Sequence, residues 1–413
     1  MMSSDLHRAA LSLGLLLITA VSAAAEDWPQ WRGPRLDGTS REHGVPLHWS
    51  ANSNVLWKTP LPGTGHASPI VLGDRVFTVA SVPETEARLL LCLDRRSGRL
   101  LWQTTVLTAP LEKKHSLNSH ASSTPASDGE RVFTAFLDRR EVVVSAHDDQ
   151  GRPVWTKRPG PFASMHGFCS SPVLFQDLVI VNCDHDGDGY IVALERATGR
   201  ERWRIDRPNK TRSYCAPLIR QMAGRMQMSL SGSKCVASYD PRDGRLLWII
   251  DGPTDQFVAS PVFSERTGLL FITGGFPDHH ILAIRPDGDG NVTRSKIAWR
   301  TTKGVAYVPS PICEGDYFLV VSDAGIAHCF NAATGEILWT ERLGEHHASL
   351  VSAAGRVYFL NDNGVAHVVA PAPSYRLLAR NELGEKTFAS PAISRGCIFL
   401  RTDRHLYCIG NPD

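Results

Sequence analysis

Three aspartates at alternate positions are the residues whose spacing most directly indicates chemistry. Asp184, Asp186 and Asp188 are followed by a glycine, an aliphatic residue and Glu195 at the positions that the calcium-binding EF-hand loop requires. An EF-hand needs a helix on each side of this loop, whereas residues 178–181 and 190–194 are predicted strands. We therefore favour an acidic hairpin tip and retain a calcium ion bound by these three carboxylates as an alternative hypothesis.

A second group of candidate residues lies just before predicted strands, at what we expect to be the mouth of a central channel. It contains histidines and, at one place in the chain, a lysine, an arginine and a tyrosine: His66, His120, His166, Lys210, Arg212, Tyr214 and His347. Such side chains gathered at one mouth could bind an anionic ligand or a metal ion. The competing interpretation is that the imidazoles fill turns, because no pair of them has the sequence spacing of a metal site.

An internal repeat supplies the elements that must position these residues. Two small residues followed by proline introduce an apolar strand, as in Ala67-Ser68-Pro69, and a tryptophan such as Trp102 closes each unit except one, which has Leu378. These markers recur roughly every 40–50 residues, a period typical of propellers and solenoids. Turns rich in Asp, Asn and Gly separate short apolar strands, and no helical periodicity occurs after residue 26.

The number of repeats predicts how the ring closes. First strands begin after eight entries, at residues 67, 123, 170, 215, 259, 309, 348 and 389, of which only the one at Ala348-Ser349-Leu350 lacks the proline. The last unit has no room for a fourth strand, whereas residues 54–58 form a predicted fourth strand with nothing before it. We therefore predict an all-β fold, an eight-bladed β-propeller of four-stranded antiparallel blades in which this N-terminal strand completes the last blade.

Composition and the first residues limit the class of protein. The chain has 413 residues, of which 21% are charged, and a net charge of +2, so electrostatics gives no reason to expect nucleic acid as a partner. Arg8, the apolar run at residues 11–21 and the small residues up to Ala25 have the pattern of a secretory signal peptide, too short for an integral membrane anchor. We expect cleavage near Ala25 and a periplasmic or secreted monomer. The predicted divisions are residues 1–25 (signal peptide), 26–50 (an extension on the propeller surface) and 51–413 (propeller).

The nine cysteines favour packing over chemistry. Cys92, Cys329 and Cys408 occupy a position in the third strand that other units fill with alanine or serine, so we predict buried thiols. Cys169 and Cys215 begin the first strands of adjacent blades, and the sequence leaves open whether they pair. Nucleophile-elbow, zinc-protease and phosphate-loop motifs are missing, so we name no catalytic residue.

The repeated phrase Ala-x-Asp-x-x-Thr-Gly-x-x-x-Trp resembles the repeat of PQQ-type (quinoprotein) propellers. It occurs in variant form at residues 92–102, 193–203, 238–248 and 329–339, and the resemblance covers nearly all of residues 50–410. The opening at residues 27–34 is similar to the start of PQQ-like propeller proteins of planctomycete-type bacteria, many of which are named after BamB, the outer-membrane assembly propeller. The resemblance implies Trp–Gly contacts between neighbouring blades.

The chain departs from the enzymes of that group in ways that shape the functional expectation. Quinoprotein alcohol dehydrogenases are longer and cap their cofactor with a disulfide between adjacent cysteines, which this chain lacks, and no segment matches their calcium-holding Glu/Asn/Asp set. Unlike BamB, the chain has no lipid-anchor cysteine after the cleavage site. We expect a non-catalytic binding or scaffold protein of the cell envelope, with an envelope protein or a small ligand as partner and no cofactor. The alternative is a PQQ-dependent dehydrogenase acting on an alcohol or sugar, with PQQ or calcium near the channel.

Overall fold

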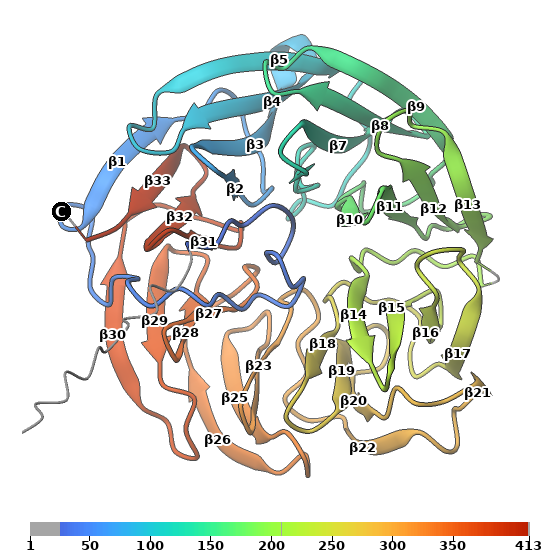
Figure 1. Ribbon diagram of the computed structural model, residues 1–413. Coiled ribbons are helices and arrows are strands. Elements are labelled where there is room, and N and C mark those ends of the chain that lie inside the picture. The colour runs from blue at the N-terminus through green and yellow to red at the C-terminus, as the bar shows by residue number, and fades with distance from the viewer. Residues whose placement is uncertain (1–24, 208, 412–413) are drawn as a thin grey trace, which may run out of the picture.

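The computed structural model describes residues 25–207 and 209–411, and these residues form eight β-sheets arranged as a ring (Figure 1). Within each sheet the strands of the repeat pair with antiparallel neighbours. The predicted all-β, eight-bladed propeller is therefore confirmed. Apart from Ala25, the predicted signal peptide lies outside the described residues, and no helix within the described ranges is long and apolar enough to cross a membrane.

Blades 1 to 4 occupy the first half of the ring. Blade 1 contains β2 (Ile70–Leu72), β3 (Arg75–Val82), β4 (Ala87–Asp94) and β5 (Leu100–Thr108), with a short 3-10 helix, η1 (Pro83–Thr85), between β3 and β4. Blade 2 contains β6 (Ala126–Ser127), β7 (Arg131–Asp138), β8 (Glu141–Asp148) and β9 (Pro153–Pro161). Blade 3 contains β10 (Val173–Phe175), β11 (Leu178–Cys183), β12 (Tyr190–Glu195) and β13 (Glu201–Asp206). Blade 4 contains β14 (Leu218–Met222), β15 (Arg225–Gly232), β16 (Cys235–Tyr239) and β17 (Leu246–Asp251).

Blades 5 to 8 complete the ring. Blade 5 contains β18 (Val262–Ser264), β19 (Leu269–Gly274), β20 (His280–Ile284) and β22 (Ile297–Thr301). Blade 6 contains β23 (Ile312–Glu314), β24 (Tyr317–Val321), β25 (Ile326–Asn331) and β26 (Ile337–Arg342). Blade 7 contains β27 (Val351–Ala353), β28 (Arg356–Leu360), β29 (Val365–Val369) and β30 (Leu377–Glu382). Blade 8 contains β31 (Ala392–Ser394), β32 (Cys397–Arg401), β33 (His405–Ile409) and, from the other end of the chain, β1 (Val55–Pro60).

The closure of the ring follows the prediction. β1 pairs antiparallel with β33, with Lys58 opposite Tyr407, so that the sheet order of blade 8 is β1-β33-β32-β31. Lys58 also donates to Glu385 Oε1 at 2.8 Å, and Thr402 and His405 bind the other carboxylate oxygen at 2.6 and 2.9 Å. Pairing the last blade in this way covers the edge that β33 would otherwise expose.

Packing between blades explains the composition of the strands. The second and third strands, such as β7 and β11, are buried on both faces by neighbouring blades and are continuous apolar runs. The fourth strands lie at the rim in Figure 1 and carry the tryptophans that contact the next blade. Trp57 donates to the carbonyl of Arg95 at 2.8 Å. Its ring packs on Gly98 so closely that a Cβ added to this glycine would lie 2.5 Å from the ring carbons. The expected Trp–Gly contact is thus present.

Blade 4 departs from the four-stranded pattern. Residues of the loop between β20 and β22 form β21 (Gly290–Asn291), which pairs in parallel with β17 and places Gly290 opposite Trp248. Trp248 is fully buried and donates to Gln227 Oε1 at 2.8 Å rather than to a carbonyl of blade 5. The acidic loop at residues 287–291 therefore covers a blade edge.

An N-terminal segment, residues 26–50, crosses the centre of the ring in Figure 1, and we call it the strap. Trp28 exchanges backbone hydrogen bonds with Val71 of blade 1, and the carbonyl of Pro29 accepts from Ser127 of blade 2. Farther along, Thr39 bridges to Ser352 of blade 7. The strap thus contacts blades 1, 2 and 7 of the propeller.

Candidate functional site at the propeller axis

The segments that lead into the first strands line the central channel. Successive side chains of an extended chain point to opposite sides, so residues two positions apart face the axis together. Each blade contributes one residue to a circle that we call the hydroxyl ring. Its members are Ser68, Thr124, Ser171, Ser260, Ser310, Ser349 and Ser390, and blade 4 contributes Ala216 instead of a hydroxyl. A second circle two residues earlier, the mouth ring, consists of His66, Ser122, Cys169, Tyr214, Val258, Val308, His347 and Phe388.

The two rings enclose a cavity of about 110 Å³ on the axis. All residues of the mouth ring line it, together with Trp31 of the strap and the hydroxyl-ring residues of blades 3 to 8. His66, Tyr214 and His347, three of the residues predicted from sequence, are therefore brought together. Among the described residues that line this cavity there is no Asp, Glu, Lys or Arg.

The hydroxyl ring joins neighbouring blades. A backbone N–H at the channel has no strand partner, and the hydroxyl of the next blade supplies the missing acceptor. The N–H donors and their acceptors are Ser68 to Thr124 (3.0 Å), Thr124 to Ser171 (2.9 Å), Ser260 to Ser310 (2.9 Å), Ser310 to Ser349 (2.9 Å), Ser349 to Ser390 (2.8 Å) and Ser390 to Ser68 (3.1 Å). Ala216 interrupts this circle, and there the indole Nε1 of Trp31 donates to Ser260 Oγ at 3.2 Å.

His347 is held in one orientation by Asp362. The carboxylate oxygen Oδ2 lies 2.7 Å from His347 Nδ1, and Oδ1 accepts the backbone N–H of His347 at 2.8 Å. Burial lowers the pKa of His347, but the Asp362 carboxylate more than offsets burial and leaves the pKa raised. Because Nδ1 is bonded to Asp362, Nε2 is the ring nitrogen that can meet a ligand.

His66 faces the same part of the channel but stays neutral. The Phe388 ring packs edge-on against both imidazoles, with a centroid distance of 4.8 Å to His66 and to His347. Burial and the nearby positive charge of Arg401 lower the pKa of His66 to about 3. At neutral pH this imidazole is therefore an uncharged hydrogen-bonding group.

Tyr214 connects the cavity to the surrounding loops. Its hydroxyl lies 2.5 Å from Ser164 Oγ, and its ring centroid is 6.0 Å from that of His166. Burial raises the pKa of the Tyr214 phenol, so the group remains protonated and can donate a hydrogen bond.

The other four predicted channel residues lie farther out. His120 Nε2 is 2.9 Å from the carbonyl oxygen of Glu112, and the His166 ring is 5.6 Å from that of His115. Lys210 and Arg212 are held in ion pairs with aspartates, and none of the four lines the cavity. The reason is register: His120 and His166 precede the hydroxyl ring by four and five positions, so they do not share the position of His66 and His347.

Each of the three aspartates has its own cationic partner. They follow β11 and precede β12, which confirms strands on both sides of the loop. Asp184 is fully buried and accepts from Arg207 Nε at 2.8 Å and from Nη2 at 3.2 Å. Asp186 pairs with Arg212 and Asp188 with Lys210, both at 2.8 Å. The calcium hypothesis requires the three carboxylates to share one ion, and no three His, Cys, Asp or Glu residues of the described chain form a group that could hold a metal ion.

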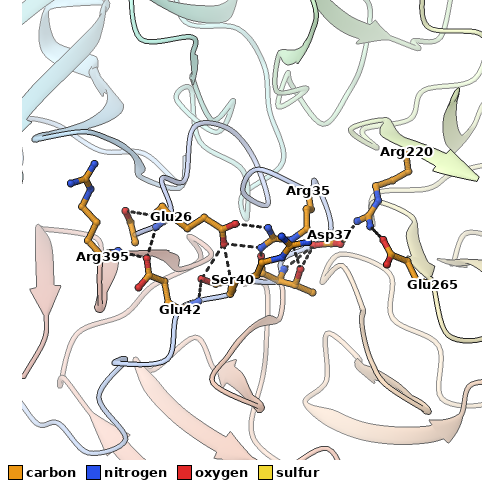
Figure 2. A network of polar contacts seen from close by, with 11 residues as sticks. Glu26, Arg35, Asp37, Ser40, Glu42, Arg220, Glu265 and Arg395 are labelled. Atoms are coloured by element: carbon orange, nitrogen blue, oxygen red, sulfur yellow. Dashed lines mark hydrogen bonds and ion pairs between the residues drawn. The ribbon is translucent and has the colours of Figure 1, made fainter. Parts of the chain in front are cut away.

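The strap covers the end of the channel opposite the mouth ring. Arg32 is fully buried and donates to the carbonyls of Pro311 (2.5 Å) and Leu350 (3.2 Å), the residues that follow the hydroxyl ring in blades 6 and 7. Figure 2 shows the polar network that holds the strap in place: Glu26 binds Arg35, Asp37 binds Arg220 at 2.5 Å, and Arg220 also binds Glu265. The mouth ring belongs to the other face, which we call the loop face because it carries the segments before the first strands and the hairpins between second and third strands.

The cysteines examined for pairing are separate thiols. Cys169 and Cys215 are both free, and Cys215 Sγ lies 3.3 Å from the carbonyl oxygen of Ala216. Burial raises the pKa of Cys169 to about 12, so this mouth-ring residue is a protonated thiol at neutral pH. Cys92, Cys329 and Cys408 are buried, as predicted.

Several residues of the site were not among the sequence candidates: Trp31, the hydroxyl ring, Phe388 and the orienting Asp362. The hydroxyl ring and Phe388 could have been found by counting back from each small-small-Pro motif, because the alternation of an extended chain fixes which positions face the axis. Trp31 and Asp362 had no such signal, since their positions depend on contacts between distant segments.

Comparison with known proteins identifies the relatives of this architecture. A family model described as "Outer membrane protein assembly factor BamB" matches residues 85–341 and, in a second match, residues 277–374. A search of curated proteins finds no match.

Solved structures share the fold at low sequence identity. BamB from Moraxella catarrhalis aligns with a TM-score of 0.58 at 13% identity, covering 86% of this chain and 97% of that one. Quinohemoprotein alcohol dehydrogenase from Comamonas testosteroni aligns with a TM-score of 0.67 at 11% identity, covering 94% and 81%. A europium-containing methanol dehydrogenase aligns with a TM-score of 0.54 at 12% identity, covering 90% and 89%. At such identities these alignments show a common fold, which hosts both assembly factors and enzymes.

Proposed function

The chain belongs to the BamB family of PQQ-repeat propellers, and from this premise we propose that it is an exported, non-catalytic binding protein whose loop face docks a protein of the cell envelope. The signal-peptide pattern at residues 1–25 supports export, and the opening at residues 27–34 supports a planctomycete-type member. The observation that carries the proposal is the distribution of exposed apolar side chains. Met165 (56%), Phe276 (54%) and Leu117 (47%) are the most exposed large hydrophobic residues of the described chain, and all three belong to loop-face segments.

Two of these side chains belong to one continuous surface. The carbonyl of His166 accepts from the backbone N–H of His115 at 3.2 Å and from Asn118 Nδ2 at 2.8 Å, which ties the loop of Leu117 to the loop of Met165. The same loop carries Lys113 and Lys114. Apolar groups with adjacent cations suit a partner segment that presents apolar side chains beside acidic ones.

The alternative, a PQQ-dependent dehydrogenase, fits the residues poorly. Small-molecule sites usually occupy about 300–1,000 Å³, and the axial cavity of about 110 Å³ is too small for a tricyclic quinone. The group's enzymes would also need a metal site beside the quinone, and the described residues contain no group of three His, Cys, Asp or Glu suited to it. We therefore assign no step to this cofactor.

The test is site-specific photo-crosslinking in the source cell. A photoreactive residue at Met165 should give discrete adducts with one or a few envelope proteins, whereas one at the rim residue Val154, which is 45% exposed, should not. Leu117→Asp should reduce the adducts at Met165 without lowering the melting temperature. Adducts equal in pattern at both positions, or turnover of an alcohol after incubation with PQQ and calcium, would overturn the proposal.

A further inference from the structure

We infer that the axial cavity binds a small carboxylate, a monoanion of about the size of acetate. The first observation is the donor content of the hydroxyl ring. Ser310, Ser349 and Ser390 are each at most 5% exposed, and each hydroxyl oxygen accepts a backbone N–H of the preceding blade. No acceptor for the hydrogens of these hydroxyls occurs among the hydrogen bonds of the described residues. Buried donors without an acceptor are costly, so the ring favours an acceptor on the axis.

Positive charge near the cavity favours an anionic acceptor. Arg32 binds the carbonyls of Pro311 and Leu350, one residue after the hydroxyl ring, and Arg401 binds the carbonyl of Ala67 at 3.3 Å, between the two rings. Both guanidinium groups are buried, and the Nε–H of each has no hydrogen-bond partner. Charges in such surroundings are only weakly screened by solvent.

Carboxylates near the cavity are already bound to other groups. Asp37 is close to Arg32, but its carboxylate is bound to Arg220 at 2.5 Å. At the mouth, Asp362 is held by the His347 imidazole, and Asp323 accepts the backbone N–H of the mouth-ring residue Val308 at 3.2 Å. The guanidinium groups of Arg32 and Arg401 instead contact carbonyls next to the hydroxyl ring, so the cations lie deeper along the axis than these two carboxylates.

Size and access select the kind of anion. About 110 Å³ accommodates three or four water molecules at roughly 30 Å³ each, or one anion of two to four heavy atoms. The apolar members of the mouth ring, Val258, Val308 and Phe388, suit the methyl or methylene group that a carboxylate carries. This site goes beyond the docking of a protein, because a free carboxylate can fill it without any partner.

Chloride is a suitable probe, because exchange of a bound halide broadens its NMR line. The mature protein should broaden the chloride line, and acetate should reverse the broadening, whereas benzoate at equal ionic strength should not. Binding of acetate should also raise the pKa of His66, measured from its ring resonances, because a neighbouring anion favours the imidazolium. A chloride line that is unaffected by the protein would show that the cavity holds water only and would overturn the inference.

The break in the hydroxyl ring offers a matched pair of variants. Ala216→Ser supplies the missing hydroxyl and should lower the dissociation constant of acetate about threefold to tenfold, whereas Ser310→Ala should raise it by a similar factor. Ala333→Ser, in an exposed turn, is the control and should change nothing. Because Ala216→Ser removes no existing contact, an unchanged affinity in a folded Ala216→Ser protein would count against the site.

Acetate competition with the crosslinking experiment shows whether the carboxylate belongs to the docked protein or is a free anion. If acetate binds and also reduces the adducts formed at Met165, the carboxylate belongs to the docked protein. If acetate binds and those adducts persist, the ligand is a free anion. If no adducts form at Met165 in the source cell, only the docking proposal is refuted, because chloride and acetate binding are measured on the isolated protein.

Discussion

Both faces of the ring carry ion pairs, but they differ in the groups that they leave without a partner. On the face covered by the strap, carboxylates and cations satisfy one another: Glu26 binds Arg35, and Glu42 accepts the backbone N–H groups of Arg395 and Gly396. On the loop face, Met165 and Phe276 are exposed to water, and the cavity presents hydroxyl donors without acceptors. The repeat supplies both ends of the channel. One added segment, the strap, covers the channel end opposite the mouth ring and distinguishes the two faces.

The largest expected effect tests whether the buried Asp184–Arg207 ion pair stabilises the loop face. Asp184→Asn should lower the free energy of unfolding by about 3–5 kcal/mol, because it leaves the fully buried Arg207 without its charge partner. Denaturant titration followed by tryptophan fluorescence measures this. A loss below about 1 kcal/mol would mean that the pair does not anchor the face.

The strap face should be sensitive at one buried side chain. Arg32→Met should cost about 2–4 kcal/mol, because the carbonyls of Asp37, Pro311 and Leu350 would lose a donor in the interior. The same denaturant titration applies, with Arg41→Met on the exposed side of the strap as control. Equal stability of the two variants would show that the strap is not fixed through Arg32.

Acid should weaken the closure between β1 and blade 8. Burial would raise the pKa of Glu385, but hydrogen bonds from Lys58, Thr402 and His405 more than offset it and lower the pKa to about 2. The stabilisation is therefore complete above the ordinary pKa of 4.5 and is lost as the pH falls from 4.5 towards 2. We expect a loss on the order of 1–2 kcal/mol, reduced by the exposure of Lys58. Glu385→Gln should flatten the melting temperature across this pH range relative to wild type, and an unchanged profile would contradict the assignment.

The smallest effect is expected at the tip of the loop face. Asp188→Asn should leave the melting temperature unchanged, because its ion pair with Lys210 lies in solvent. Millimolar calcium should likewise leave the melting temperatures of wild type and variant equal. A calcium-dependent rise in the wild type that Asp188→Asn removes would restore the metal hypothesis.

The fold could be predicted almost completely from sequence, because the spacing of the repeat can be read directly from its recurring residues. Seven motifs that end in proline, the related Ala348-Ser349-Leu350 and the unpaired strand at residues 54–58 determine the number of blades and the closure. The addition of β21 to blade 4 could not be foreseen, because a parallel pairing between loop and strand leaves no periodic signal at residues 287–291.

The site was predicted only in part. His66, Tyr214 and His347, which were candidates from sequence, line the cavity because each stands two positions before the hydroxyl ring. His120 and His166 were grouped with them because they are near the motif in sequence. Which side chains face the axis depends instead on their number of positions before the hydroxyl ring, because side chains of an extended chain alternate. The partners of the three aspartates in residues 184–188 had no sequence signal: Arg207, Arg212 and Lys210 lie downstream, and only the folded chain shows that they pair with these carboxylates.

The strap also has a consequence for the order of folding. Its partners are spread along the whole chain: Glu26 accepts from Ser394, Pro29 from Ser127, and Trp31 donates to Ser260. Contacts that join such distant residues are slow to form because long loops must first close. We expect the blades to assemble before the strap docks, so that a segment synthesised before any blade is the last to reach its final position.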